Sequence, residues 1–437
     1  MTEGTGGKRA GGAGGNGNAS GGSSGATGGS SGGSSGGLGG TSGGSGGGSG
    51  AGGNGGSVGA GGSSPAPDAN PSDDSASGET AGPVKPEPGP VGDLASFKYV
   101  QPIAMDTMAA GVAGEVANYP VAVLLTDKNF NFDQTKPAGE DIRFGKADGT
   151  PLPYAIETWD KAGKSAAIWV KLDKVLGNNA TQSFNMYWGK ADAGDASDST
   201  KVFSAADGFM AVYHLNEDGN NDPGGYKDSS DDPINGHGIA MAPGSAVPAR
   251  VGKGTHLQNS RVNFKGQWIT VDDPKAIDMF NADHPLTVSI WGIADTYQAQ
   301  SKAGNYETVF SKGDHEWTIQ RDYQGKFETC TNPGGCGPGP AAGTKVWYHF
   351  YLVLGKGTQA FYLNGKPATT SGNGGAKGVH PIGIGNQSQY GEKRQWDGII
   401  DEARIMSVQR SADWIKLEYE SQKEGSTFLK FGPVQTK

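Results

Sequence analysis

The sequence predicts an all-β protein: a disordered Gly/Ser-rich tether, a small antiparallel β-sandwich, and a jelly roll that ends in a short helix. Three observations predict this class. Short apolar segments recur between residues 94 and 432, and turn signals separate them. Many of these segments alternate apolar and polar side chains, as half-buried strands do. The first 93 residues hold almost nothing apolar, so they cannot offset the entropy of folding.

The tether has two parts. Glycine accounts for 77 of the 437 residues of the chain. It makes up about half of residues 1–63, a composition that behaves as a flexible coil. Residues 64–93 contain repeated prolines and acids, which stiffen a chain toward polyproline II. We therefore divide the chain into a tether (1–93), a first domain (94–203) and a second domain (204–432).

Charge and hydropathy limit the partners. The formal net charge is −9, and the chain has no basic stripe, so nucleic acid is not an expected ligand. No apolar run is long enough to span a membrane, and the first residues, MTEGTGGKRAGG, lack the hydrophobic core of a signal peptide. Long Gly/Ser tethers before β-rich domains are nevertheless typical of secreted or surface proteins. We expect an extracytoplasmic protein whose tether attaches it to a cell envelope, and a true start upstream of Met1. A cytoplasmic protein is the alternative.

The two cysteines, Cys330 and Cys336, flank a turn-rich segment with Pro333 and two glycines. Such a connection can bring two Cα atoms within bridging distance. We predict a disulfide that closes a hairpin tip, contributes roughly 2 kcal/mol and indicates an oxidising compartment. Two free thiols or half of a metal site are the alternatives, but zinc would need two further soft ligands and the chain has no second cysteine pair.

In the first domain, short segments predict a small antiparallel sandwich. Asp148-Gly149 is a hairpin signal between two of them. Asp141, Glu157 and Asp160 are candidates for acid–base chemistry, but scattered acids more commonly cap turns and keep a surface soluble. The expected strands are 97–106, 119–126, 142–144, 154–159, 166–172 and 184–188.

In the second domain, the number of strands favours two large sheets in a jelly roll. Asn364-Gly365 is a second hairpin signal, and a helix over 411–421 is expected to begin at the N-cap Ser411. The expected strands are 209–215, 253–258, 267–271, 286–293, 307–312, 316–321, 326–330, 347–354, 358–363, 382–384 and 396–405.

The last predicted strand, WDGIIDEARI, is the central segment of the predicted fold. Two acids, Asp401 and Glu402, interrupt its apolar run, and a buried unpaired carboxylate is costly. Because side chains alternate along a strand, we expect these two to point to opposite faces.

Several motifs of the first domain resemble a bacterial domain of unknown function that commonly precedes a laminin-G-like module. They are FKYVQPI, YPVAVLLTDKNFNF, DIRFGKADGTPLPYAIETWD, AAIWVKL and FNMYWGKADAGDASD. The resemblance implies an extracytoplasmic accessory domain and no particular activity.

The second domain resembles a laminin-G-like jelly roll of the concanavalin A-like lectin and glucanase superfamily. The resemblance rests on VYHLNEDG with KDSSDDPINGHGIA, LTVSIWGIAD, WYHFYLVLGKGTQAFYLNGKPA and WDGIIDEARIMSVQRSADWIKLEYES. It implies a Ca²⁺ ion between the opening loop and the final strand, with Asp228, Asn235 and Asp401 as the matching ligands; oxygen ligands of this kind suit the ion. In the alternative, Asp401 accepts backbone N–H groups or pairs with Arg404, and Asp228 makes an Asx-turn.

Catalysis is disfavoured. Retaining glucanases need two carboxylates about 5 Å apart, and we find no acids alternating on one strand in the glucanase pattern. His214 and His349 lie inside apolar strands, where a buried, hydrogen-bonded histidine is the more common case. The chain has no nucleophile elbow and no phosphate-binding glycine loop between a strand and a helix.

Aromatic residues beside Asn, Gln and Asp are the remaining clue, because a sugar ring stacks on them while its hydroxyls form hydrogen bonds. We expect Trp317 and Trp396 to pack in the sandwich, and take Tyr323 and Tyr390 as candidate ligand-binding residues. The hypothesis is a non-catalytic binding protein that recognises a glycan or a surface protein through jelly-roll loops. A polysaccharide hydrolase and a structural spacer are the alternatives.

Overall fold

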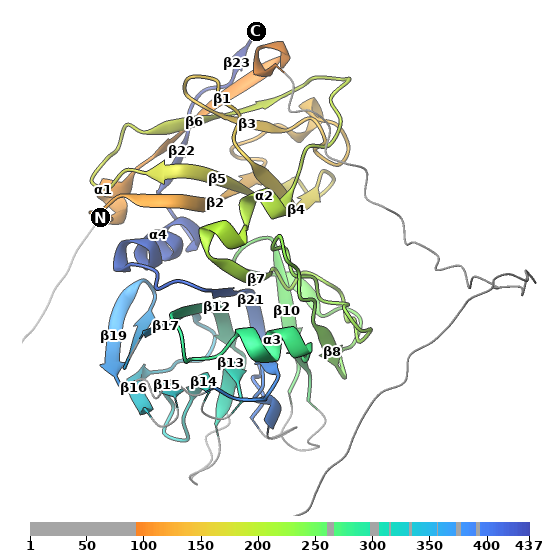
Figure 1. The fold of residues 1–437 in the computed structure, drawn as a ribbon. Helices are drawn as coiled ribbons and strands as arrows, with labels where there is room; N and C mark the ends of the chain where they lie inside the picture. Colours follow the sequence, from red (N-terminus) through yellow and green to blue (C-terminus); the bar gives the residue numbers. More distant parts are fainter. Residues whose placement is uncertain are drawn as a thin grey trace, which may run out of the picture. The chain divides into compact units, whose positions relative to one another are not determined.

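The computed structural model describes residues 93–259, 266–297, 306–313, 316–331, 334–355, 357–372, 377–389 and 394–437. The described residues belong to one compact unit. The predicted tether, except Asp93, lies outside them. The described part consists mostly of antiparallel strands in two sandwiches (Figure 1), which confirms the predicted all-β class. It has no helix long and apolar enough to cross a membrane.

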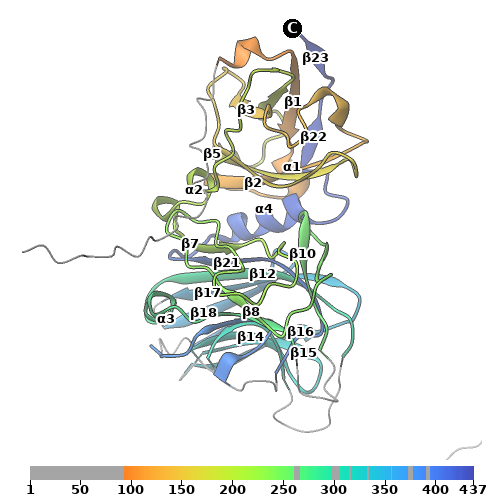
Figure 2. The same ribbon diagram turned by 90° about the vertical axis from the view of Figure 1, so that its right-hand side faces the viewer.

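The first sandwich packs two small sheets face to face (Figure 2). One has the strand order β22-β1-β6-β3, with β23 also paired to β1, and the other has the order β2-β5-β4. Their bounds are β1 Tyr99–Met105, β2 Val116–Thr126, β3 Arg143–Lys146, β4 Tyr154–Asp160, β5 Ser165–Val175, β6 Ser183–Trp188, β22 Leu429–Phe431 and β23 Gln435–Thr436.

The C-terminus completes this first sandwich. Ile103 of β1 is paired with Phe431 of β22, and Val100 with Gln435 of β23. Residues Leu429–Phe431, which the motifs assign to the second domain (204–432), thus pair with the first domain instead. The reason is that a three-residue strand carries almost no sequence pattern, and its partner lies more than 300 residues away.

The jelly roll has an eight-stranded sheet, β19-β18-β17-β12-β21-β10-β9 with β7 beside β21, and a seven-stranded sheet, β16-β15-β14-β13-β20-β11-β8. The strands of the first are β7 Phe209–Tyr213, β9 Ala246–Pro248, β10 Lys253–Leu257, β12 Leu286–Ala294, β17 Trp347–Gly355, β18 Thr358–Leu363, β19 Lys366–Ser371 and β21 Gly398–Met406. Those of the second are β8 His237–Ile239, β11 Trp268–Val271, β13 Glu307–Lys312, β14 Trp317–Arg321, β15 Lys326–Thr331, β16 Gly335–Ala341 and β20 Ile382–Ile384.

Short helices occupy the connections. The α-helices are α1 Thr107–Ala110, α2 Ser199–Val202, α3 Pro274–Met279 and α4 Ala412–Gln422, and the 3-10 helices are η1 Leu94–Ser96, η2 Phe132–Gln134 and η3 Ala205–Asp207. Helix α4 begins as predicted, because the Ser411 side chain accepts a hydrogen bond from the Trp414 N–H. The Asn364-Gly365 hairpin also forms, with positive φ at both residues (53° and 72°), as a type I′ turn requires.

Two large hydrophobic cores hold the described part together, and a small third cluster includes Phe97 and Tyr187. The jelly-roll core lies between its two sheets and includes the fully buried Trp317 and Trp396, as expected. The core of the first sandwich continues through α4 onto the outer face of the eight-stranded sheet, where Tyr351 and Met406 join Trp414 and Tyr119 in one cluster. The two sandwiches therefore share a packed, buried junction.

Strand β21 runs through the middle of this junction, and a β-bulge changes its alternation. Ser289 of β12 is paired with Arg404 and Trp291 with Asp401, so that one residue of β12 faces two on β21. Glu402 has a φ of 54°, in the left-handed region. Ile400 and Ala403 enter the jelly-roll core while Asp401 and Glu402 stay outside it. Our expectation that the two acids point to opposite faces was wrong, because the bulge adds one residue to the strand.

Candidate functional site

The outer face of the seven-stranded jelly-roll sheet carries a row of polar side chains. Thr308 on β13 is paired with Gln320 on β14, and Gln320 with Glu328 on β15. Their neighbours in sequence, Val309, Ile319 and Phe327, fill the jelly-roll core. Alternation along each strand therefore places Thr308, Gln320 and Glu328 side by side on the opposite face.

Gln320 is at the centre of this polar face. Its Nε2 donates to Glu328 Oε1 at 2.8 Å and lies 3.6 Å from Cys330 Sγ. Its Oε1 has no hydrogen-bond partner within the protein, and neither has the Thr308 hydroxyl beside it, although both atoms are buried. Burial of an unpaired polar group costs about 1–3 kcal/mol, so a polar partner that reached either atom would be favoured.

Aromatic and charged side chains adjoin the row. The Arg394 guanidinium lies over the Tyr306 ring at 4.7 Å from its centroid. Partial burial raises the pKa of the Tyr306 hydroxyl, and the negative charge of Glu328 raises it further. A half-buried tyrosine, an arginine, a glutamate and an amide thus meet at one end of β13–β15.

The predicted ligand-binding residues are placed as follows. Tyr323 lies in the turn between β14 and β15, adjoins the polar face and is 36% exposed. Tyr390 lies outside the described residues.

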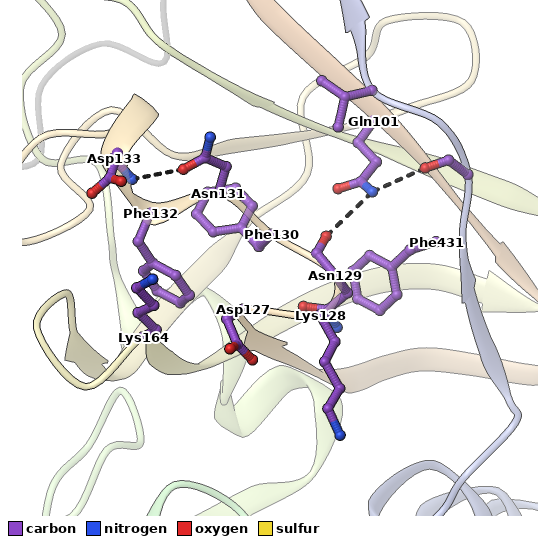
Figure 3. Close-up of a pocket in the computed structure, with 12 residues that line it drawn as sticks. Gln101, Asp127, Lys128, Asn129, Phe130, Asn131, Phe132, Asp133, Lys164 and Phe431 are labelled. Carbon is purple, nitrogen blue, oxygen red and sulfur yellow. Dashed lines mark hydrogen bonds between the residues drawn. The ribbon is translucent and has the colours of Figure 1, made fainter.

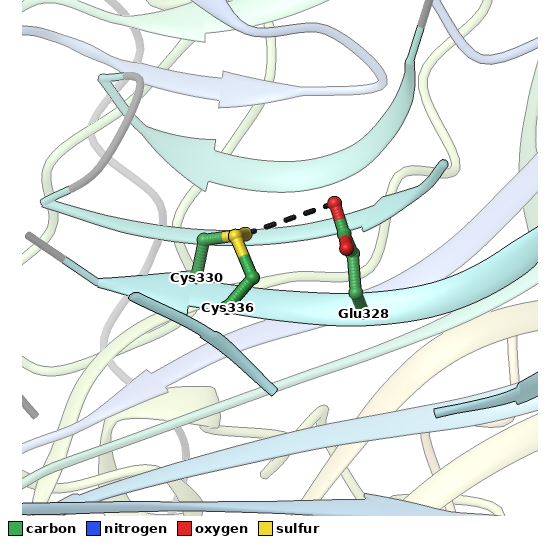
Figure 4. Close-up of side chains that lie close together, drawn as sticks. All are labelled: Glu328, Cys330 and Cys336. Atoms are coloured by element: carbon green, nitrogen blue, oxygen red, sulfur yellow. Dashed lines mark hydrogen bonds between the residues drawn. A yellow bond between two sulfur atoms is a disulfide. The ribbon is translucent and has the colours of Figure 1, made fainter. Parts of the chain in front are cut away.

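The predicted disulfide is present on the same face. Cys330 on β15 is paired with Cys336 on β16, and the two sulfurs are bonded, with Cα atoms 4.0 Å apart. Figure 4 shows the bridge beside Glu328, whose Oε1 lies 3.8 Å from Cys330 Sγ. Bridged sulfurs are not thiolate ligands, so Glu328 and this pair do not form a metal site.

The predicted calcium ligands make protein contacts instead. Asp228 accepts hydrogen bonds from the backbone N–H groups of Val212, Ser230 and Ile234, the second of which closes an Asx-turn. Asn235 Oδ1 accepts from the Asp228 N–H at 2.9 Å, and Asp401 Oδ2 accepts from the Val251 N–H at 2.8 Å. These contacts fit the alternative given for Asp228 and Asp401, and the ion stays a prediction.

A second cluster of ionisable groups is buried at the junction of the sandwiches. Glu402 Oε1 lies 2.6 Å from His214 Nδ1, and Glu402 Oε2 accepts from Arg404 at 2.6 Å. Arg404 also reaches Glu418 of α4 at 3.3 Å. Glu157 of β4 accepts from the Trp169 indole and lies 3.6 Å from His214. His214, Arg404 and the three glutamates thus connect both domains.

The pKa of each acid in this cluster depends on which charged groups lie next to it. Burial raises the pKa of Glu157, and the nearby Glu402 and Asp401 raise it further. Burial and Glu402 likewise hold the pKa of Asp401 well above its usual range. For Glu418, burial acts in the same direction, but Arg404 and His349 outweigh it and lower the pKa to about 2. The pKa shifts therefore favour ionised Glu402 and Glu418 against Arg404, and they favour the protonated forms of Glu157 and Asp401.

His214, Glu157 and Glu402 offer three ligand atoms within 4.8 Å of one another. We interpret the cluster as structural, because Arg404 and the Trp169 indole already pair with the two glutamates. Both histidines are buried as expected, but only His214 is also hydrogen-bonded; the two ring nitrogens of His349 have no hydrogen-bond partner among the described residues. The sequence offered no sign that Glu157, 245 positions before Glu402, would join it.

Comparison with known families agrees with the domain order inferred from the motifs. Residues 138–216 match the family described as a domain of unknown function (DUF2341). Residues 264–416 match the concanavalin A-like lectin/glucanases superfamily. The resemblances stated from the sequence are thereby confirmed. Among curated proteins, none matches the chain.

Several solved structures are distantly similar in fold. Domain 4 of an extracellular arabinanase from Geobacillus stearothermophilus, in complex with arabinotriose, is 18% identical, with 49% of this chain and 98% of that chain covered and a TM-score of 0.35. Trypanosoma rangeli sialidase in complex with the inhibitor DANA is 10% identical, with 61% and 43% covered and a TM-score of 0.37. The binding domain of botulinum neurotoxin DC, in complex with SialylT, is 12% identical, with 50% and 52% covered and a TM-score of 0.37. None of these likenesses is strong enough to indicate a ligand for this chain.

Proposed function

We propose that the protein is a non-catalytic, extracytoplasmic binding protein whose jelly roll recognises carbohydrate through its polar face. The polar face is defined as Thr308, Gln320, Glu328, Tyr306 and Arg394, with Tyr323 at its edge. The observation that carries the proposal is the pair of buried oxygens without partners, Gln320 Oε1 and Thr308 Oγ1, beside aromatic rings. Sugar hydroxyls donate and accept hydrogen bonds, and sugar rings stack on aromatic faces.

The disulfide supports the compartment part of the proposal, because such bonds persist in oxidising surroundings. Attachment to a cell envelope through residues 1–93 belongs to the same proposal. A surface protein as ligand is the alternative outcome of the experiment below.

A printed glycan array tests the proposal. The full chain should bind a subset of glycans, and Gln320→Ala and Tyr306→Ala should each weaken that binding about tenfold, the loss expected for one good hydrogen bond or stacking contact. Gln359→Ala is the matched control, because Gln359 is also buried with an unpartnered Oε1 but lies on β18 of the other sheet.

Glycan binding that persists in both polar-face variants would overturn the assignment of the face. Release of reducing ends from a glucan substrate by the wild type, lost in Glu328→Gln, would overturn the non-catalytic part and favour a hydrolase. An array with no signal, together with capture of a surface protein that the two variants lose, would replace carbohydrate by protein as the ligand.

A further inference from the structure

A polar groove runs along the first sandwich, outside the jelly-roll face. It consists of two adjoining hollows. The outer one, of about 670 Å³, lies between the loop 127–133, the hairpin residue Lys164 and the C-terminal strand (Figure 3). The inner one, of about 740 Å³, lies at the junction with the jelly roll and is lined by Trp347 and Gln422. Both hollows are lined by Lys128, Asn129 and Phe431, so they share one wall.

Each hollow has a buried amide with one unpartnered atom. Gln101 lines the outer hollow and is only 4% exposed. Its Nε2 donates to Gly432 O at 2.9 Å and to Asn129 O at 3.4 Å, as Figure 3 shows. Two carbonyl acceptors require the NH₂ group on that side, which fixes the orientation of the amide. The Gln101 Oε1 is therefore turned away from both carbonyls and has no partner within the protein.

Gln422 has the opposite arrangement in the inner hollow. It is 1% exposed, and its Oε1 accepts a hydrogen bond from the Trp291 indole N–H at 2.6 Å. An indole N–H can only donate, so the oxygen must face it and the Nε2 is left without a partner. The residues that line the groove thus include one buried acceptor and one buried donor without a partner among the described residues.

The walls add aromatic surface and balanced charge. Phe431 is half-buried and faces both hollows, and the half-buried Trp347 lines the inner one. In the outer hollow, the carboxylates of Asp127 and Asp133 are matched by the ammonium groups of Lys128 and Lys164.

The inner hollow is lined by three cations, Lys128, Arg250 and Lys423, and by Glu424. Arg250 is paired with Glu424 at 3.6 Å and Lys423 with Glu420, and the negative end of helix α4 offsets part of the remaining positive charge. The groove therefore offers no strong preference for an ionic ligand.

We propose that this groove is a second binding site and that it takes an uncharged oligosaccharide. A hydroxyl-bearing chain satisfies an unpaired acceptor and an unpaired donor alike, stacks on rings and needs no charge partner. A peptide strand fits less well, because the edge strand β22 has three residues and offers few ladder hydrogen bonds. The site gives the first sandwich a role that does not depend on the jelly-roll face.

Hydrogen exchange measured by mass spectrometry tests the proposal on the full chain. The probes are cellohexaose, xylohexaose and mannohexaose, with hexagalacturonic acid as the charged counterpart. An uncharged hexasaccharide should slow amide exchange in residues 126–133 and 423–432. Lys128→Ala, which removes an exposed side chain shared by both hollows, should weaken that sugar about tenfold. Lys366→Ala, at an exposed lysine on β19, is the matched control and should leave the affinity unchanged.

Each outcome of this experiment either supports or overturns the groove as a second binding site. Slower exchange in residues 126–133 and 423–432 that persists in Gln320→Ala supports the groove as a separate site. Slower exchange confined to residues 306–328 overturns the groove and leaves the jelly-roll proposal intact. The groove proposal is overturned if hexagalacturonic acid binds most tightly, or if no uncharged hexasaccharide binds at millimolar concentration. Neither result affects the proposal for the polar face, which the glycan array tests separately.

Discussion

At the scale of single residues, the bulge at Glu402 determines which groups the two acids of β21 contact. With Glu402 in the left-handed region, both carboxylates leave the jelly-roll core: that of Glu402 reaches His214 and Arg404, and that of Asp401 reaches the Val251 N–H. The two acids then share the junction with Glu157, Glu418 and the Arg404 guanidinium, while Arg250 also acts on Asp401 and Arg410 on Glu418. Because burial disfavours charge, only some of these carboxyl groups are expected to ionise, and their pKa values therefore shift in opposite directions.

Glu418→Gln should destabilise the protein, by about 3 kcal/mol at pH 7, because it breaks a buried ion pair. The pKa of Glu418 is about 2 in the folded protein, below its ordinary value, so its contribution is present above the ordinary value and is lost as the pH falls toward 2. Urea unfolding should therefore show a larger difference from wild type at pH 7 than at pH 3. Glu115→Gln, at an exposed ion pair with Lys174, is the control and should change stability little at either pH.

Glu157→Gln should have the opposite pH dependence. The raised pKa of Glu157 means that the folded protein keeps a proton which the unfolded chain releases, so wild-type stability falls as the pH rises above the ordinary value of the carboxyl group. A glutamine mimics the protonated acid and can still accept the Trp169 hydrogen bond. The melting temperature of the variant should thus decline less than that of wild type between pH 5 and pH 8. An equal decline in both would contradict a protonated Glu157.

At the scale of elements, the hairpin β15–β16 depends on its disulfide. Strand β16 is rich in glycine and proline, which are poor strand formers, and most of it is exposed. The bridge between paired residues Cys330 and Cys336 fixes its register with β15. The spacing of the cysteines was enough to predict this bond, whereas β16 itself was missed because GCGPGPA has no alternation.

The double variant Cys330→Ser/Cys336→Ser should lose roughly 2 kcal/mol of stability, the loop-entropy contribution of so short a ring. The measurement is the urea midpoint with unchanged slope. Wild type treated with a reducing agent should show the same midpoint as the variant, and a midpoint unaffected by reduction would contradict a stabilising role.

Sequence patterns predicted many individual strands, but they did not predict how strands and side chains from distant parts of the chain are arranged relative to one another. Apolar alternation identified β12, β17 and β21, and Trp317 and Trp396 are buried as expected. The bulge at Glu402 could not be predicted, since a one-residue insertion leaves no mark in the pattern. The polar face was partly foreseen through Tyr323, but Gln320 and Thr308 were not singled out, because partnerless oxygens are visible only in coordinates.

At the scale of the whole molecule, the two sandwiches form one folding unit. They share a core through α4 and a charge cluster, and the C-terminal strands complete the first sheet. A chain that ends at Thr427 lacks the buried Phe428 together with β22 and β23, and should lose at least about 3 kcal/mol. Calorimetry should show a lower melting temperature, whereas a chain ending at Gly432, which lacks only β23, should lose much less. Equal melting temperatures for all three chains would contradict this role of the C-terminus.

The same calorimetry tests the calcium ion implied by the superfamily resemblance. A bound ion predicts a lower melting temperature when a chelator is added, whereas the alternative, in which Asp228 and Asp401 only accept backbone N–H groups, predicts no change. A decrease on chelation that added Ca²⁺ reverses would support the ion, and an unchanged melting temperature would reject it.

The return of the C-terminus has a consequence for proteolysis. Two stretches of polypeptide join the sandwiches, one leading from β6 to β7 and the other from α4 to β22. The first includes the exposed residues Ala191 and Asp192, where a protease could cut. One cut there would yield two fragments in a denaturing gel, yet β22 would keep them together in solution. Separating the sandwiches covalently requires severing both stretches, so limited digestion should nick the protein long before it liberates a domain.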